Sequence, residues 1–363
     1  MLISNEHSNE HQGDELVENT KIAVVGTGAN GASMGADMVR AGLDVTFIEQ
    51  WPAHVEAMRE KGLTVHFPDG TTEVTPVSVF HFCQVAELRD QFDIVFISVK
   101  TYDTRWVTEL IKPLLHETSV VVGLQNGMTI DDVADIVGAQ RTIGAVLGIA
   151  ANMFTPGVVV RQVPPAGTWL TVGTLDGTRT AALENVAEAL GHAGAISISD
   201  DIRSSKWMKL LANIPEMLPS AILNVPLLTA VGIEGVRAVM DEASREAYRT
   251  AIDLGITMVP IFGKTQDDVP DNDQYALDLL DAVLASYSLP DTRVAVLQDW
   301  DKGRRGELDA FSGYIVAQQE KLGTTAPVNE AILRIAELVE SGKLEPRPEN
   351  ASLLIEALGA VPV

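Results

Sequence analysis

Apolar residues in the first half of the chain gather in short runs, and the segments between these runs repeat their apolar residues at helical spacing. Short, nearly continuous apolar runs are typical of strands buried on both faces of a parallel sheet. The runs span residues 21–25, 44–49, 93–99, 119–124 and 142–149, and the helical segments span 51–62, 102–116 and 180–193. This alternation predicts an α/β domain with a doubly wound sheet.

The pattern changes near residue 201. Up to that point we also expect short strands at 63–66 and 73–79 and hairpin strands within 156–174. From 201 to 340 the spacing is helical with almost no strand signal, most clearly at 201–213, 235–254, 273–285 and 306–322. We therefore expect an all-helical C-terminal domain over 201–340, a disordered polar tail over 1–20 and a C-terminal extension over 341–363.

A glycine motif follows the first apolar run. Gly26-x-Gly28-x-x-Gly31 stands between that run and a helix of small residues, which is the order of a βαβ unit that holds a dinucleotide pyrophosphate on a helix N-terminus. Gly26 permits the tight turn, Gly28 lets the backbone approach the phosphates, and Gly31 lets the helix pack closely on the strand. Ala29 and Asn30 open this helix and complete the expected phosphate site. The motif predicts a dinucleotide-binding Rossmann domain over residues 21–200.

Glu49 ends the second strand and indicates which dinucleotide binds. A carboxylate at this position accepts hydrogen bonds from the adenosine ribose hydroxyls of NAD and repels the extra phosphate of NADP. The next residue is Gln50, and no arginine or lysine follows before Arg59. We therefore expect NAD rather than NADP. The alternative is that Glu49 points to solvent and a basic side chain from elsewhere in the sequence reads the phosphate.

Composition narrows the partners and the compartment. The formal net charge of −24 argues against nucleic acid and anionic membrane surfaces, and no apolar run approaches the length of a membrane span. The single cysteine, Cys83, permits no intramolecular disulfide, so a cytoplasmic protein is expected. The sequence shows no metal-binding spacing of histidine, cysteine and carboxylate residues, and we predict no metal. It leaves open whether the protein is a homodimer.

A lysine and an asparagine in the helical domain could carry the chemistry. Lys209 and Asn213 are four residues apart, so they share one face of the predicted helix. A lysine beside a nicotinamide can protonate the oxygen formed when hydride reaches a carbonyl, and burial would lower its pKa toward neutrality. By itself such a pair is more often a solvated helix face.

Several motifs occur in the order seen in ketopantoate reductases, and together the chain resembles this family from residue 21 to 338. They are the glycine loop, Ser98-Val99-Lys100, Gln125-Asn126-Gly127-Met128, Trp207-x-Lys209-Leu210-x-x-Asn213, and Leu297-Gln298-Asp299 followed by Glu307. The resemblance implies a Rossmann domain joined to a helical domain, with a small-molecule substrate reacting in the cleft between them.

The resemblance also implies a role for individual residues. Lys209 matches the family's general acid, and Glu307 matches the carboxylate that anchors the substrate and steadies that lysine. Lys100 and Asn126 match residues that line the cofactor and reach the substrate, and Asn213 matches a substrate-contacting asparagine.

The chain departs from the family pattern at three positions. Gln50 stands where family members usually carry an arginine for the phosphate of NADP. Met217 replaces a second asparagine, and Ala295 replaces a serine, both of which would bind the polar end of the substrate. Losing these groups favours a more apolar or differently shaped 2-oxo acid or ketone, unless neighbouring groups compensate.

We therefore predict an NAD(H)-dependent oxidoreductase that moves hydride between nicotinamide and a small carbonyl or alcohol, such as a 2-oxo acid, a 2-hydroxy acid or a related secondary alcohol. One alternative is an NADPH-dependent 2-dehydropantoate 2-reductase of pantothenate synthesis. Another is a non-catalytic NAD(H)-sensing module, which would keep the glycine loop without Lys209 and Glu307. A dehydrogenase with a histidine acid is excluded for the helical domain, because no histidine follows His192.

Overall fold

A computed structural model describes residues 20–286 and 288–360. The predicted polar tail therefore lies outside the described residues, except for Thr20. The chain forms two compact units, one made of residues up to 125 together with 129–202, and the other of 126–128 together with the residues from 203 on.

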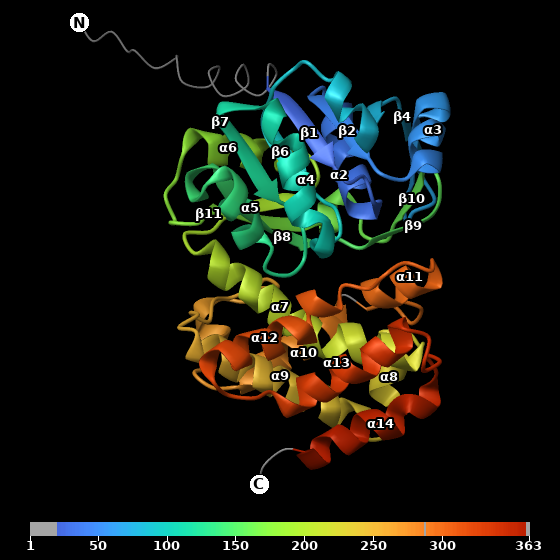
Figure 1. Cartoon of the computed structure of the whole chain (residues 1–363), viewed down its shortest axis with the longest axis vertical. Helices are drawn as coiled ribbons and strands as arrows, with labels where there is room; N and C mark the ends of the chain where they lie inside the picture. Colours follow the sequence, from blue (N-terminus) through green and yellow to red (C-terminus); the bar gives the residue numbers. More distant parts are fainter. Residues whose placement is uncertain (1–19, 287, 361–363) are drawn as a thin grey trace, which may run out of the picture. The chain divides into compact units, whose positions relative to one another are not determined.

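The first unit is built on an eight-stranded sheet with the predicted doubly wound arrangement (Figure 1). Counted from the edge strand β5, six parallel strands follow the order β5-β2-β1-β6-β7-β8. Strand β11 comes next and is antiparallel to β8, and β12 forms the other edge, parallel to β11. The strands are β1 Lys21–Val25, β2 Asp44–Glu49, β5 Ser78–His81, β6 Phe92–Ile97, β7 Leu115–Gly123, β8 Thr142–Gly148, β11 Trp169–Thr174 and β12 Ala195–Ile198. Strand order reverses beside β1, so the carboxyl ends of β1 and β6 form the switch point where such sheets bind ligands.

Helices cover both faces of this sheet because successive residues of each strand point to opposite sides. Ile22 and Val24 of β1 pack into one hydrophobic cluster with α2 and α6, whereas Ala23 and Val25 pack into another with α4 and α5. The helices are α2 Ala29–Arg40, α3 Pro52–Lys61, α4 Thr104–Ile111, α5 Ile130–Val137 and α6 Ala181–Gly191. The near-continuous apolar runs in the sequence follow from this double coverage.

A second, four-stranded sheet has the order β4-β3-β10-β9, with β3 Leu63–His66, β4 Thr72–Thr75, β9 Ala151–Thr155 and β10 Val158–Arg161. The single strand expected at 73–79 is wrong, since Pro76 separates β4 from β5 and the two strands join different sheets. Proline cannot donate to a strand ladder, which explains the break.

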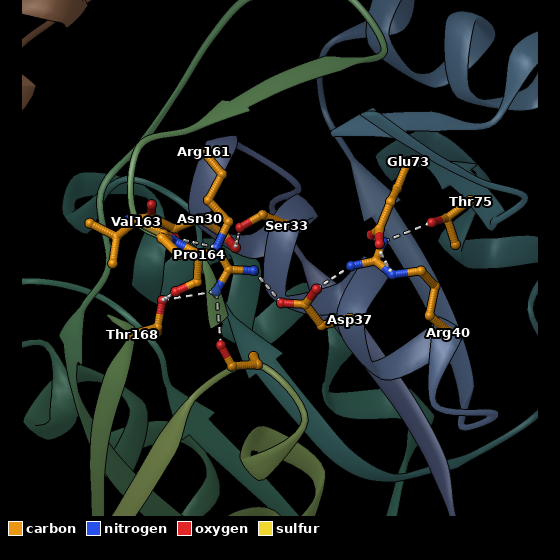
Figure 2. Close-up of polar contacts among 11 residues, drawn as sticks. Asn30, Ser33, Asp37, Arg40, Glu73, Thr75, Arg161, Val163, Pro164 and Thr168 are labelled. Carbon is orange, nitrogen blue, oxygen red and sulfur yellow. Dashed lines mark hydrogen bonds and ion pairs between the residues drawn. The ribbon is translucent and has the colours of Figure 1, made fainter. Parts of the chain in front are cut away.

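Buried ion pairs fasten this second sheet to α2 (Figure 2). Asp37 on α2 accepts from Arg161 of β10 and from Arg40, and Arg40 also contacts Glu73 of β4 at 2.8 Å. Arg161 is fully buried, and its remaining donors reach main-chain oxygens of residues 163 and 193 and the Thr168 hydroxyl. Every nitrogen of the buried guanidinium thereby donates at least one hydrogen bond, which offsets the cost of burying its charge.

All regular elements among the described residues of the second unit are helices, joined by loops (Figure 1). Its helices are α7 Ile202–Leu223, α8 Leu227–Gly232, α9 Val236–Asp253, α10 Gln274–Ser286, α11 Ala295–Asp301, α12 Ser312–Leu322, α13 Pro327–Glu340 and α14 Ala351–Glu356. Helix α9 is central and packs against α10, α12, α13 and α14. Its buried Glu246 accepts hydrogen bonds of 2.8 Å from the amides of Val328 and Asn329 at the start of α13, a position that favours a carboxylate. None of the helices in the described ranges has the length and apolar character needed to cross a bilayer.

Candidate active site

The glycine loop joins β1 to α2 at the switch point of the large sheet. Gly26 has a φ of +86°, and a Cβ on it would lie 2.6 Å from the amide nitrogen of Val99. A Cβ on Gly31 would lie 2.5 Å from the carbonyl oxygen of Gly26, so any side chain would push α2 off the strand. At Gly28, by contrast, no atom lies within 4 Å of an added Cβ.

These surroundings fit a dinucleotide pyrophosphate. Gly28 caps the N-terminus of α2 and leaves open space over the backbone, while the half-buried Ala29 and Asn30 begin the helix. The first turn of α2 holds no acidic residue, so nothing there opposes a bound anion. The residues of the loop are therefore suited to hold the phosphates of a dinucleotide.

Glu49 is buried at the end of β2 and is bonded to the glycine loop. Its Oε2 accepts hydrogen bonds from the amide and the hydroxyl of Thr27, at 2.6 and 3.0 Å, and its Oε1 accepts from the amide of Trp51 at 2.9 Å. The carboxylate therefore does not point to solvent, as the alternative reading required. Three of its roughly four acceptor positions are used, which leaves room for about one further donor.

His54 holds Thr27 from its other side, and the sequence analysis missed this residue. The ring is fully buried, with Nε2 at 3.0 Å from the carbonyl oxygen of Thr27 and Nδ1 accepting from the amide of Gly157 at 2.8 Å. Because Nδ1 accepts a hydrogen bond, the ring proton is on Nε2, which donates a hydrogen bond to the carbonyl oxygen of Thr27. Its place five residues after Glu49, on the helix that follows β2, was the only available signal.

The basic residue that follows β2 is committed to other partners. Arg59 donates to the carbonyl oxygen of Val79 through two nitrogens, at 3.2 and 3.0 Å, and pairs with Glu56 at 3.0 Å. Gln50 is exposed and neutral. The residues after β2 therefore place the buried carboxylate of Glu49 beside the glycine loop, and Arg59 is held by Val79 and Glu56.

Lys100 and Asn126 follow the carboxyl ends of the neighbouring strands β6 and β7, and both are half-buried. Gln125, between β7 and Asn126, bonds inward: its Nε2 donates to the carbonyl oxygen of Val99 at 2.6 Å and to the Thr104 hydroxyl at 2.9 Å. Gln125 thus fixes the loops on which Lys100 and Asn126 lie. The cofactor and substrate roles of those two residues stay predictions.

In the helical unit, Lys209 lies in the first half of α7. Burial lowers the pKa of its ammonium group, and the carboxyl of Glu216 on the same helix opposes this shift. The Nζ atom lies 5.3 Å from the centre of the Phe262 ring, a cation–π distance that also favours the charged form. Phe262 has a φ of +59°, a conformation that bulky residues rarely adopt.

Asn213 follows one turn later on the same face of α7 and is fully buried. Within the described part of the chain, neither its Nδ2 nor its Oδ1 has a hydrogen-bond partner. An unsatisfied buried amide is costly, so this amide is open to a further polar partner. Its contact with the substrate stays a prediction. Met217, four residues further, is buried as an apolar side chain.

Glu307 and Ala295 lie at the starts of helical segments in the same unit. Glu307 is buried and precedes a short 3-10 helix, Leu308–Ala310, while Ala295 is the half-buried first residue of α11. The carboxyl whose charge acts on Lys209 is that of Glu216. The expectation that Glu307 orients Lys209 and anchors the substrate stays a prediction.

Two further titratable side chains on α7 escaped the sequence analysis. Lys206 is buried, and burial lowers its pKa to about 7; Glu216 is also buried, and burial raises its pKa to about 7. The signal for Glu216 was present in its spacing, seven residues after Lys209 and three after Asn213. In the described ranges, no cluster of three histidine, cysteine or carboxylate side chains could hold a metal ion.

Comparison with known proteins agrees with the resemblance. The family described as "Ketopantoate reductase PanE/ApbA" matches residues 22–177, and "Ketopantoate reductase PanE/ApbA C terminal" matches residues 201–340. A 2-dehydropantoate 2-reductase of Archaeoglobus fulgidus is 28% identical over 325 residues, which cover 89% of this chain and 98% of the relative.

Solved structures show the same fold. A PanE/ApbA family ketopantoate reductase from Ralstonia eutropha superposes with a TM-score of 0.75 at 28% identity, covering 89% of this chain and 99% of that one. D-mandelate dehydrogenase, solved with NADH and anilino(oxo)acetate, gives a TM-score of 0.78 at 21% identity with the same coverage, a likeness that shows the fold alone. The chain therefore belongs to the ketopantoate reductase family of oxidoreductases.

Proposed function

We propose that the protein is an NAD(H)-linked oxidoreductase that interconverts a small carbonyl compound and its alcohol, with Lys209 as the general acid and base. The observation that carries this proposal is the pairing of Lys209, whose pKa is lowered by burial, with the unsatisfied amide of Asn213 one helical turn away. Such a pair supplies a proton donor and a polar anchor on the same helix face.

A bound nicotinamide would supply or take up the hydride. In the direction of reduction, the ammonium group of Lys209 gives its proton to the oxygen of the former carbonyl. In the direction of oxidation, the neutral amine accepts the proton of the alcohol. Both forms are needed in turn, and a lysine whose pKa burial has lowered exchanges between them more readily near neutral pH.

The preference for NAD rests on Glu49. Its buried charge lies against Thr27 of the glycine loop, where the adenosine ribose of a dinucleotide is expected, and a phosphate on that ribose would be repelled. The engagement of Arg59 with Val79 and Glu56 supports the same preference, because an arginine at this edge is the usual partner of that phosphate. In D-mandelate dehydrogenase the same fold holds NADH.

We infer that the substrate is a small 2-oxo acid, its 2-hydroxy acid or a related secondary alcohol. Met217 and Ala295 offer apolar surface where the family pattern has polar groups, which favours a more apolar substituent. A second candidate is the NADPH-dependent reduction of 2-dehydropantoate, favoured by the names of relatives such as that of Archaeoglobus fulgidus. Homodimerisation stays a prediction, which the mass of the protein in solution tests.

The role of Lys209 is tested by Lys209→Met, which keeps the aliphatic stem and removes the amine. We expect turnover to fall by about 100-fold or more, the usual contribution of a general acid, while the dissociation constant of NADH stays within about twofold. Both are measured, by initial rates and by fluorescence titration.

Lys206→Met is the matched control, since Lys206 is a buried lysine on the same helix with a lowered pKa. It should retain most of the turnover. Equal turnover in Lys209→Met and the parent protein contradicts the assignment, and a loss confined to Lys206→Met transfers the role to that residue.

A further inference from the structure

Helix α7 carries a stripe of buried and half-buried polar side chains along one face. Lys209, Asn213, Glu216 and Ser220 are spaced by four, three and four residues, so they fall within about 60° of one another around the helix axis. Asn213, Glu216 and Ser220 are buried. The buried face of a helix is normally apolar, and a polar stripe there requires an explanation.

Glu216 is the unusual member of this stripe. The residue is only 7% exposed, yet within the described chain its carboxyl group makes no hydrogen bond or ion pair. The buried carboxylate of Glu246 on α9 shows the ordinary structural alternative, because it accepts three hydrogen bonds from the start of α13. Glu216 therefore does not serve as a cap or a structural ion pair.

Glu216 and Lys209 lie two turns apart on the same face of α7, and the charge of each acts on the other. Burial is the main cause of the raised pKa of Glu216, and Lys209 opposes it; burial likewise lowers the pKa of Lys209, and Glu216 opposes that shift. Among the titratable groups of the described residues, each is the one whose charge acts on the other. From the loop after α9, Lys209 meets the uncharged ring of Phe262.

We propose that Glu216 is a positioning residue that acts through Lys209, setting the protonation state of that lysine and thereby the pH range of the reaction. The inference rests on the proposed function, in which Lys209 exchanges a proton with the substrate oxygen. An ionised Glu216 favours the ammonium form that reduction needs, and a protonated Glu216 favours the amine that oxidation needs. The two groups titrate as a pair, because each changes the charge that the other experiences.

The test uses Glu216→Gln, which keeps the shape of the side chain and removes its charge. Lys209 is labelled with acetic anhydride at a series of pH values, without substrate or cofactor, and its acetylation is followed by mass spectrometry. Only the neutral amine reacts, so the midpoint reports the protonation of Lys209. We expect Glu216→Gln to move this midpoint to lower pH by roughly one unit, because the opposing negative charge is gone. Glu216→Asp should keep the midpoint near that of the parent protein.

Glu246→Gln is the control, since it removes a buried carboxylate of the same unit that acts on the start of α13. It should lower the melting temperature and leave the Lys209 midpoint unchanged. Should Glu216→Gln fail to fold, Glu216→Met fills the same buried space without charge and should give the same shift.

Different outcomes test the role of Glu216 and the function proposed for Lys209. An unchanged midpoint in the uncharged Glu216 variant overturns the role of Glu216, even where Lys209→Met has lost its turnover. A shifted midpoint together with full turnover of Lys209→Met upholds the coupling and overturns the proposed function. If Glu216→Gln shifts the midpoint and Lys209→Met loses its turnover, the pH profile of reduction by NADH should change as well. With 2-dehydropantoate or benzoylformate as substrate, the alkaline limb of that profile should move to lower pH in Glu216→Gln.

Discussion

At the scale of single residues, the cofactor half of the site depends on how Thr27 is held. Glu49 accepts from its amide and hydroxyl, and His54 donates to its carbonyl. The sequence indicated that Glu49 ends β2, but it could not show that the carboxylate turns back onto the loop. That contact joins residues 22 positions apart and exists only because β1 and β2 are neighbours in the sheet.

His54→Phe tests this arrangement. The change leaves the carbonyl of Thr27 and the amide of Gly157 buried without a partner, at a cost of about 1–3 kcal/mol each in the free energy of unfolding. Because the loop is loosened, we also expect a weaker affinity for NADH with little change in turnover at saturation. His66→Phe is the control, since His66 is exposed on β3 of the same unit. Unchanged stability and affinity in His54→Phe would show that Thr27 does not need this support.

At the scale of elements, the sequence predicted the strands and helices of the first unit well because their apolar runs are unambiguous. Helix α7 is longer than expected and continues past Asn213 to Leu223 through Pro215 and Pro219. Each proline removes one main-chain donor, and the surrounding burial outweighs this loss. Glu216 lies in the stretch that the sequence analysis left out, which is why the polar stripe escaped it.

The N-terminus of α2 yields a paired prediction. Gly28→Ala should leave the free energy of unfolding within about 0.5 kcal/mol, because the added Cβ meets nothing and the φ of −62° suits alanine. Its affinity for NADH should fall roughly tenfold or more, since the methyl group occupies the space left for the phosphates.

Gly31→Ala should instead lower the free energy of unfolding by about 1–3 kcal/mol, because the Cβ would lie 2.5 Å from the main-chain oxygen of Gly26. Thermal unfolding and NADH titration of both variants separate the two roles. Full NADH affinity in Gly28→Ala would mean that the phosphates do not approach this glycine.

At the scale of the whole molecule, the parallel sheet and the helical second unit were both foreseeable, because the change of periodicity near residue 201 is sharp. The grouping of residues 126–128 with the helical unit was not, since nothing in their composition sets them apart from the loop that contains them. Likewise, the apolar Met217 and Ala295 indicate a change of substrate without naming it.

The central claim is a preference for NAD over NADP, which is argued from Glu49, Gln50 and Arg59. Enzyme activity tests this preference most directly. The measurement is the initial rate with NADH and with NADPH, side by side, for the reduction of 2-dehydropantoate and of more apolar 2-oxo acids such as benzoylformate. We predict a higher kcat/KM for NADH than for NADPH with whichever substrate is turned over. Faster turnover of 2-dehydropantoate with NADPH would contradict the account and assign the protein to the second candidate function.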